Sequence, residues 1–344
     1  MDDTTLRESW ALLEATTVQT STNSPLSHQA TSKKNYGKLL KYSNVTSYSQ
    51  LEHFHRCPRK FQLAKERAAF QTGWQQGQNV DFAFGHAVGA GIQHYLMTKN
   101  LPESWINAML AWSADWEADI AKKRKNIWGA LIAVEKFVHV WADSLDEWEL
   151  VTMPNGKPAI EVSISLHCND GHKHYMHIDI VMRNKRTGKI AVWDAKTTGF
   201  AEPEEALYAN SSQALGYAIP LSHILGHEVM DYEVYYLVYS STAREWALLP
   251  FAKSFLESAE FVKDLVITQN LIDDYEGMRF YPKRGAACYE FFRRCEFFGE
   301  CNLTADETLP LLPDEEEAEV TDYVVDLQDV IATLKAKRLE RSGK

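Results

Sequence analysis

The sequence predicts an α/β fold in which a mixed central sheet is flanked by helices. Up to about residue 150, apolar residues recur at helical spacing, and from Ala159 onward apolar and polar residues alternate as in strands. A helical pattern then separates three predicted strands from a later strand pair. With 344 residues, 45% of them hydrophobic, the chain is long enough to bury a sizeable core.

The first half of the chain is expected to be mainly helical. Residues 1–42 are polar and weakly periodic, so we expect a mobile arm with a short helix near 6–15. Ser47 followed by Gln50 matches a capping box, which predicts a helix from there through Phe61. Further helices are expected at 85–97, 102–123 and 128–148.

The second half carries the predicted strands. They are expected at 160–164, 175–182, 190–195, 234–239 and 246–251. Helices are expected at 203–225, 255–275 and 326–341. We predict one large domain over 43–304, with a helical part at about 85–150, a core at about 159–250 and a cysteine loop at 288–301. An acidic linker and a last helix would occupy 305–344.

Composition limits the possible classes of protein. No stretch approaches 18 consecutive apolar residues and the N-terminus lacks an apolar segment, so we expect no membrane association and a cytoplasmic location. The net charge of −11 is unusual for a nucleic-acid-binding protein. Basic residues nevertheless cluster locally, and binding depends on the local field rather than on total charge. The five cysteines do not suggest a disulfide framework.

One predicted hairpin carries the chemistry. A turn centred between Arg186 and Thr187 would place Asp179 directly opposite Asp194, with Cβ atoms about 5 Å apart. Lys196 lies two residues beyond Asp194, so it points to the same face. A one-residue slip in register would destroy this arrangement.

Two opposed carboxylates in an apolar hairpin repel each other unless something neutralises them. Mg²⁺ or Mn²⁺ prefers oxygen ligands and retains waters that can act as nucleophiles. A lysine beside the cation can orient or deprotonate a water, or offset charge on a phosphate. This combination suits phosphodiester hydrolysis, whereas an isolated Asp-x-Lys triplet is more often two solvated surface groups.

Four short motifs then resemble those of the PD-(D/E)XK nuclease superfamily and, within it, the RecB-like exonucleases. Thr46–Leu51 with Cys57–Phe61 resembles the N-terminal helix motif of the family. Met176–Val181 resembles "GxxDxV", with Met where the family usually has Gly. Asp194–Thr197 resembles "DxKT", and Gln213–Tyr217 resembles "QxxxY". The resemblance covers Thr46–Asn302 and implies a restriction-endonuclease-like core.

The resemblance implies roles for the hairpin residues. Asp179 and Asp194 would bind the metal, together with the carbonyl of Ala195, and Lys196 would be the catalytic lysine.

Further residues surround this set. Gln213 and Tyr217, at i and i+4 on one helix face, would position the metal site or the DNA strand. Glu161 matches a glutamate often found before the hairpin, in a supporting or a purely structural role. The family usually carries a further histidine ligand where this chain has Gly89. His86, about one helical turn earlier, could substitute, and His94 is the weaker candidate.

The cysteines form a second predicted site. Cys288, Cys295 and Cys301 lack the paired spacing of zinc sites, and Cys57 lies far upstream. With it they resemble the iron–sulfur staple of RecB-like and CRISPR-adaptation exonucleases, which implies a [4Fe–4S] cluster. Buried free cysteines at chance spacing are the alternative. Cys168 has no place in the set.

The sequence therefore predicts a Mg²⁺- or Mn²⁺-dependent deoxyribonuclease, an exonuclease acting on single-stranded DNA or DNA ends in recombination, repair or phage DNA processing. Two alternatives stay open: a weak or inactive DNA-binding module that keeps the fold, and a structure-specific endonuclease or RNase. No Walker motif is present, so unwinding would need a helicase partner. A recombinase or single-strand-binding protein is a further expected partner.

Overall fold

The computed structural model describes residues 45–70, 80–114, 124–168, 171–226, 232–278, 280–290, 293–301 and 321–341. The predicted N-terminal arm, its short helix and most of the acidic linker lie outside these ranges. The chain divides into two compact units. Unit 1 comprises residues 1–74, 164–176 and 256–335, and unit 2 comprises 75–163, 177–255 and 336–344. The predicted boundaries of a single nuclease domain stay a prediction.

Unit 2 is built on a mixed sheet, which confirms the predicted fold class. Its strands are β2 (Trp148–Leu150), the later part of β4 (Lys173–Asn184), β5 (Ile190–Thr198), β6 (Tyr232–Ser240) and β7 (Glu245–Ala252). β4 pairs antiparallel with β2 and β5, β5 pairs parallel with β6, and β6 pairs antiparallel with β7. The parallel step from β5 to β6 is made through α8 (Glu205–Ala209) and α9 (Ser212–Leu225).

The β4–β5 hairpin has the predicted register. Its pairs run from Arg183 opposite Ile190 to Ile180 opposite Trp193. Asn184 fixes the turn, because its Oδ1 accepts hydrogen bonds from the backbone N–H groups that follow. Gly188 has a φ of 73°, which glycine adopts without strain.

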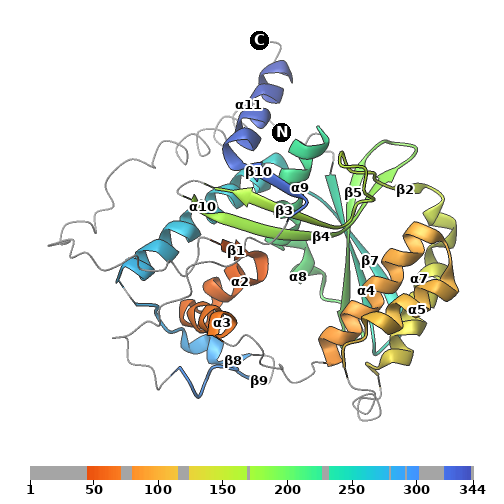
Figure 1. The fold of residues 1–344 in the computed structure, drawn as a ribbon, viewed down its shortest axis with the longest axis horizontal. Coiled ribbons are helices and arrows are strands. Elements are labelled where there is room, and N and C mark those ends of the chain that lie inside the picture. The colour runs from red at the N-terminus through yellow and green to blue at the C-terminus, as the bar shows by residue number, and fades with distance from the viewer. Residues whose placement is uncertain are drawn as a thin grey trace. The chain divides into compact units, whose positions relative to one another are not determined.

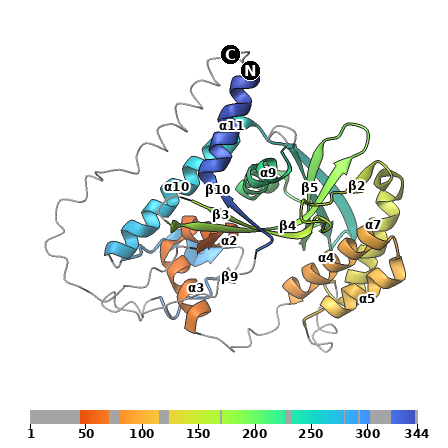
Figure 2. The ribbon, with the colours of Figure 1, turned by 45° about the horizontal axis from the view of Figure 1, so that its top comes forward.

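Helices α4 (Val80–Thr98), α5 (Leu101–Ala111) and α7 (Ile127–Leu145) form a layer beside this sheet (Figure 1, Figure 2). Trp193 of β5 packs against Trp141 of α7, with ring centroids 6.1 Å apart. Tyr239 of β6 stacks on Phe84 of α4 at 6.2 Å. Side chains alternate along a strand, so Asp194 points away from this helical layer.

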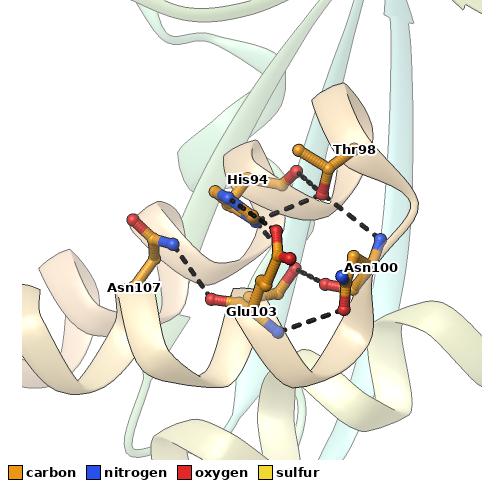
Figure 3. Close-up of polar contacts among 6 residues, drawn as sticks. His94, Thr98, Asn100, Glu103 and Asn107 are labelled. Carbon is orange, nitrogen blue, oxygen red and sulfur yellow. Dashed lines mark hydrogen bonds and ion pairs between the residues drawn. The ribbon is translucent and has the colours of Figure 1, made fainter.

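The α4–α5 connection is held by polar side chains (Figure 3). Asn100 caps α5, since its Oδ1 accepts from the backbone N–H of Glu103 at 3.2 Å. The ring of His94 lies within this junction, where Nδ1 is 3.2 Å from Oγ1 of Thr98 and Nε2 is 3.8 Å from the Glu103 carboxylate. His94, the weaker candidate for the missing metal ligand, thus contacts residues that hold the α4–α5 junction together.

Unit 1 contains β1 (Val45–Ser47), α2 (Tyr48–Arg56), α3 (Pro58–Phe70), α10 (Phe255–Met278), η4 (Gly285–Cys288), β8 (Tyr289–Glu290), β9 (Arg293–Arg294), β10 (Tyr323–Asp326) and most of α11 (Leu327–Arg341). β3 (Ile160–His167) and β4 contribute residues to both units. Within unit 1, β10 pairs parallel with β3 and β1 pairs parallel with β4. The capping box at Ser47 is confirmed.

Several predicted helix limits were wrong for local reasons. The helix expected through Phe61 breaks at Cys57, which is extended (φ −160°, ψ 107°) because Pro58 follows it. The helix expected over 203–225 is split into α8 and α9 at residues 210–211. Within the helix expected over 102–123, α5 ends at Ala111, and residues 115–123 lie outside the described ranges. No helix among the described residues is long and apolar enough to cross a bilayer.

Two glycines of α4 give a stability prediction. A Cβ at Gly91 would lie 2.5 Å from a methyl group of Val134, whereas a Cβ at Gly89 would meet nothing within 4 Å. Gly91→Ala should therefore lower the free energy of unfolding by about 1–3 kcal/mol through overpacking. The matched Gly89→Ala should raise it by about 0.5–1 kcal/mol, because alanine favours the helix. Denaturant titration checks both, and equal effects would contradict the packing of α4 on α7.

Candidate active site

The site is built around the end of the β4–β5 hairpin. Asp179 and Asp194 come directly after the last pair of the β4–β5 ladder, Ile180 with Trp193. Asp194 is completely buried and Asp179 is partly exposed. The Asp179 carboxylate reaches across to β5, where its Oδ2 accepts a hydrogen bond from the backbone N–H of Ala195 at 3.2 Å. The two acids therefore flank the same stretch of β5.

Lys196 completes the centre of this site. Its Nζ donates to Oδ1 of Asp194 at 2.9 Å and lies 2.8 Å from Oδ2. The second approach is an ion pair without hydrogen-bond alignment, so Oδ2 stays a buried oxygen with no hydrogen-bond donor. A buried acceptor without a donor is rare unless something else occupies it.

The charges in this cluster act strongly on one another. Burial raises the pKa of Asp179 well above its usual value, the Asp194 charge raises it further, and Lys196 opposes both. Burial alone would lower the pKa of Lys196, but Asp194 and Asp179 raise it above its usual value. Lys196 is therefore a firmly charged ammonium at neutral pH. This favours electrostatic stabilisation by Lys196 over proton abstraction.

Helix α9 covers the same carboxylates. Burial raises the pKa of Tyr217 well above its usual value, and the charges of Asp194 and Asp179 raise it further, so the phenol lies within electrostatic range of both acids. Gln213 donates its Nε2 hydrogen to the Tyr217 hydroxyl at 2.5 Å. The structure thus brings both predicted helix residues to the site.

Tyr208 of α8 is a site residue that the sequence did not reveal. Its pKa is raised by burial, while Lys196 lowers it and Asp194 raises it. Its ring packs on Tyr236 of β6 at 5.1 Å. No local motif marks this tyrosine, because its position depends on the break between α8 and α9.

Glu161 lies in β3, where it contacts helix α4 beside the site. It has a left-handed φ of 50°, an unusual conformation for glutamate, and Nε2 of Gln93 donates to its Oε1 at 2.5 Å. Its charge contributes to the raised pKa of Asp179. Gly85 of the same helix lies beside Thr197 of β5, since a Cβ on it would be 3.7 Å from Oγ1.

Gly89 lies one helical turn after Gly85 and one turn before Gln93, so the three share a face of α4. That face contacts β5 at one end and Glu161 at the other. Between them Gly89 leaves open space. His86 is exposed on the same helix, and no contact with Asp179 or Asp194 is seen.

The donor set suits a hard cation. Two carboxylates, one with an oxygen lacking a hydrogen bond, and a nearby carbonyl at Ala195 offer only oxygen. Mg²⁺ is bound by one or two carboxylates while keeping waters. Among the described residues no group of three or more His, Cys, Asp or Glu side chains forms a metal-binding cluster. The fit is therefore to Mg²⁺ or Mn²⁺ rather than to a fully protein-ligated ion.

The four predicted cluster cysteines all belong to unit 1. Burial raises the pKa of Cys288, and the charges of Cys295, Cys301 and Cys57 each raise it further, so these three thiols lie within electrostatic range of Cys288. The backbone N–H of Cys295 donates to the Cys288 carbonyl at 2.9 Å. All are free thiols, and none is grouped closely enough with others to form a metal-binding cluster among the described residues.

Cys57 is tied to the cysteine loop by its neighbours. Arg56 makes an ion pair with Glu290 at 3.0 Å, and the backbone N–H of Arg59 donates to the Pro282 carbonyl at 3.3 Å. Cys168 has other surroundings, where burial raises its pKa to about 11 and Gln269 opposes the shift.

Residues 45–302 match the PD-(D/E)XK nuclease superfamily, which is most of the chain. The chain belongs to this superfamily. The hairpin acids and lysine therefore stand in a nuclease fold, and the superfamily assignment indicates a phosphodiester hydrolase acting on nucleic acid.

Solved structures give weaker likenesses. A protein from Eubacterium rectale described as a "putative exonuclease" is 10% identical, with a TM-score of 0.43 over 85% of this chain and 99% of that one. SSO0001 is 14% identical, with a TM-score of 0.25 over 62% and 84% of the two chains. No curated protein matches the chain in sequence.

The raised pKa of Asp179 predicts a stability effect. A carboxyl whose pKa is raised on folding stabilises the fold at low pH and loses that contribution as pH rises through its folded-state value. In EDTA at pH 8, Asp179→Asn should therefore raise the melting temperature by roughly 2–4 °C, the shift expected for about 1 kcal/mol. Near pH 4 the difference should shrink. A variant less stable than wild type at pH 8 would show that the two acids do not repel.

Proposed function

We propose that this chain is a Mg²⁺- or Mn²⁺-dependent deoxyribonuclease that acts as a RecB-like exonuclease. The observation that supports this most strongly is the fully buried Asp194, held between Lys196 and the opposed Asp179. Without a metal, two buried acids beside one charged lysine stabilise the fold less than apolar residues of similar size would at the same positions. Such an arrangement is expected at a functional site.

A divalent ion bound between Asp179 and Asp194 would supply an activated water and offset phosphate charge. Lys196, fixed by its two contacts with Asp194, would stabilise negative charge on the phosphate in the transition state. Tyr217, held by Gln213, would orient the metal site or the DNA strand. Gln93 would hold Glu161 in a supporting position.

The direct test is digestion of end-labelled linear DNA, single- and double-stranded, with Mg²⁺ or Mn²⁺. Lys196→Ala should lower the rate by at least about a hundredfold, the typical loss of one electrostatic group. Lys189→Ala is the matched control, because Lys189 directly precedes the same strand and pairs with Glu233 on the surface. Degradation from the labelled ends would show an exonuclease, and internal cutting would favour the endonuclease alternative.

The open space at Gly89 supports the second candidate function, a weakly active or inactive binding module. If a histidine there normally strengthens metal binding, this chain should need more metal than a relative that has it. Gly89→His should then lower the Mn²⁺ concentration for half-maximal activity by about tenfold. Gly89→Ala serves as the control for helix propensity. No change with histidine would remove Gly89 from the metal site.

We also propose a [4Fe–4S] cluster on Cys57, Cys288, Cys295 and Cys301. The electrostatic effect of the other three thiols on Cys288, the ion pair of Arg56 with Glu290 in the cysteine loop, and the hydrogen bond of Arg59 to Pro282 just before that loop support it. Four thiolates suit such a cluster, which would join the start of α3 to the loop.

Anaerobically purified protein should contain about four irons per chain. Cys57→Ser should lose most of this iron, and Cys168→Ser should keep it. Equal iron contents in both variants, or none in the wild type, would contradict the cluster.

A helicase, a recombinase or a single-strand-binding protein remains the partner class we propose, because the chain has no ATP-binding loop of its own. A role in recombination, repair or phage DNA processing, in the cytoplasm, is part of the same proposal.

A further inference from the structure

Three large aromatic side chains are exposed at one end of unit 2. Phe200 is 66% exposed, Phe82 65% and Trp128 61%. Phe200 follows the end of β5, Phe82 lies in the first turn of α4, and Trp128 lies in the first turn of α7. The starts of α4 and α7 meet the same end of the sheet (Figure 1). Clustered exposed aromatics usually mark a binding surface.

Hydrogen bonds through the β6–β7 turn bring the end of β5 and the start of α7 together. Thr242, in the β6–β7 turn, donates to the Gly199 carbonyl at 2.6 Å and accepts from Nη1 of Arg124 at 2.8 Å. Arg124 lies just before α7. The β5 end, the β6–β7 turn and the start of α7 therefore form one connected surface.

Phe200 is held rigidly while its ring is exposed. Its backbone N–H donates to Oγ1 of Thr198 at 3.2 Å, and its carbonyl accepts from Oγ of Ser240 at 2.6 Å. Ser241 further clamps the loop, because both its N–H and its hydroxyl donate to the Thr198 carbonyl. A fixed backbone with an exposed aromatic ring costs little conformational entropy on binding.

The surface also carries positive charge. Arg124 and Arg244 are exposed there, and Arg124 is oriented by Thr242. Asp81, the acid beside Phe82, is already paired with Lys125 at 3.2 Å. Exposed rings interleaved with cations suit single-stranded nucleic acid, whose bases stack on aromatic groups while its phosphates meet the cations.

Phe200 lies close to the candidate active site along the chain. Phe200 follows Lys196 by four residues, roughly 13 Å along an extended chain. We propose that Phe200, with Trp128 and Phe82, is a stacking platform that binds unpaired bases of single-stranded DNA leading to Lys196, with Arg124 contacting phosphates. This inference rests on the proposed nuclease function and names the form of its substrate.

The test is binding of a fluorescent thymidine 20-mer and of a 20-base-pair duplex to full-length Lys196→Ala protein, measured by anisotropy. Phe200→Ala should weaken binding of the single strand about tenfold and binding of the duplex less than twofold. Phe200→Tyr should restore binding to within twofold. Val140→Ala is the control, since Val140 is 61% exposed and lies about 18 Å further along α7 from Trp128.

An abasic 20-mer separates stacking from charge. It should bind the Lys196→Ala protein at least as weakly as the thymidine strand binds the Phe200 variant, because it loses stacking on all three rings. Arg124→Ala should weaken the binding of all three probes. It should also reduce the slope of log affinity against log salt concentration by about one unit, because one phosphate contact is lost. Unchanged single-strand binding in Phe200→Ala, or an equal loss on duplex, would overturn the platform.

The nuclease assay on protein with intact Lys196 keeps the two proposals apart. If the protein digests DNA but Phe200→Ala leaves single-strand affinity unchanged, the platform is overturned and the nuclease function stands. Absence of digestion together with Phe200-dependent binding would support the platform and overturn the enzymatic function.

Discussion

The burial of the Asp194 carboxylate is the constraint on which the site depends. A charged group without solvent must be compensated, and here the compensation comes from one ammonium, Lys196, two residues along the same strand. The neighbouring Asp179 adds a second negative charge, which that single ammonium does not balance. The excess negative charge and the buried oxygen without a hydrogen bond suit a small, hard cation.

The excess negative charge is confined to one place in the sheet, the end of the β4–β5 ladder. The β4–β5 ladder is apolar from Met182 and Ala191 to Ile180 and Trp193, and the acids follow where its pairing ends. One side of β5 is occupied by the aromatic core of α4 and α7, with Trp193 and Trp141 in contact. The opposite side is therefore the one available to the acids, to Tyr217 of α9 and to Tyr208 of α8.

The hairpin could be predicted from the sequence because its evidence is local. The turn residues and the alternation of apolar side chains set the register, and register alone brings Asp179 opposite Asp194. The contact between Gln93 and Glu161 could not be predicted, since it joins residues far apart in the chain and depends on an unusual φ at Glu161. The break at Cys57 was predictable from Pro58 but was missed. The short strand β10 has too few residues for a periodic pattern.

The central claim is that Asp179 and Asp194 jointly hold one divalent ion. Titration of the full-length protein with Mn²⁺, followed by the loss of the free-ion electron paramagnetic resonance signal, measures this without any substrate. The account predicts one tight Mn²⁺ site in the wild type that is lost in Asp194→Ala and weakened at least tenfold in Asp179→Ala. Undiminished Mn²⁺ binding in both folded variants would contradict it.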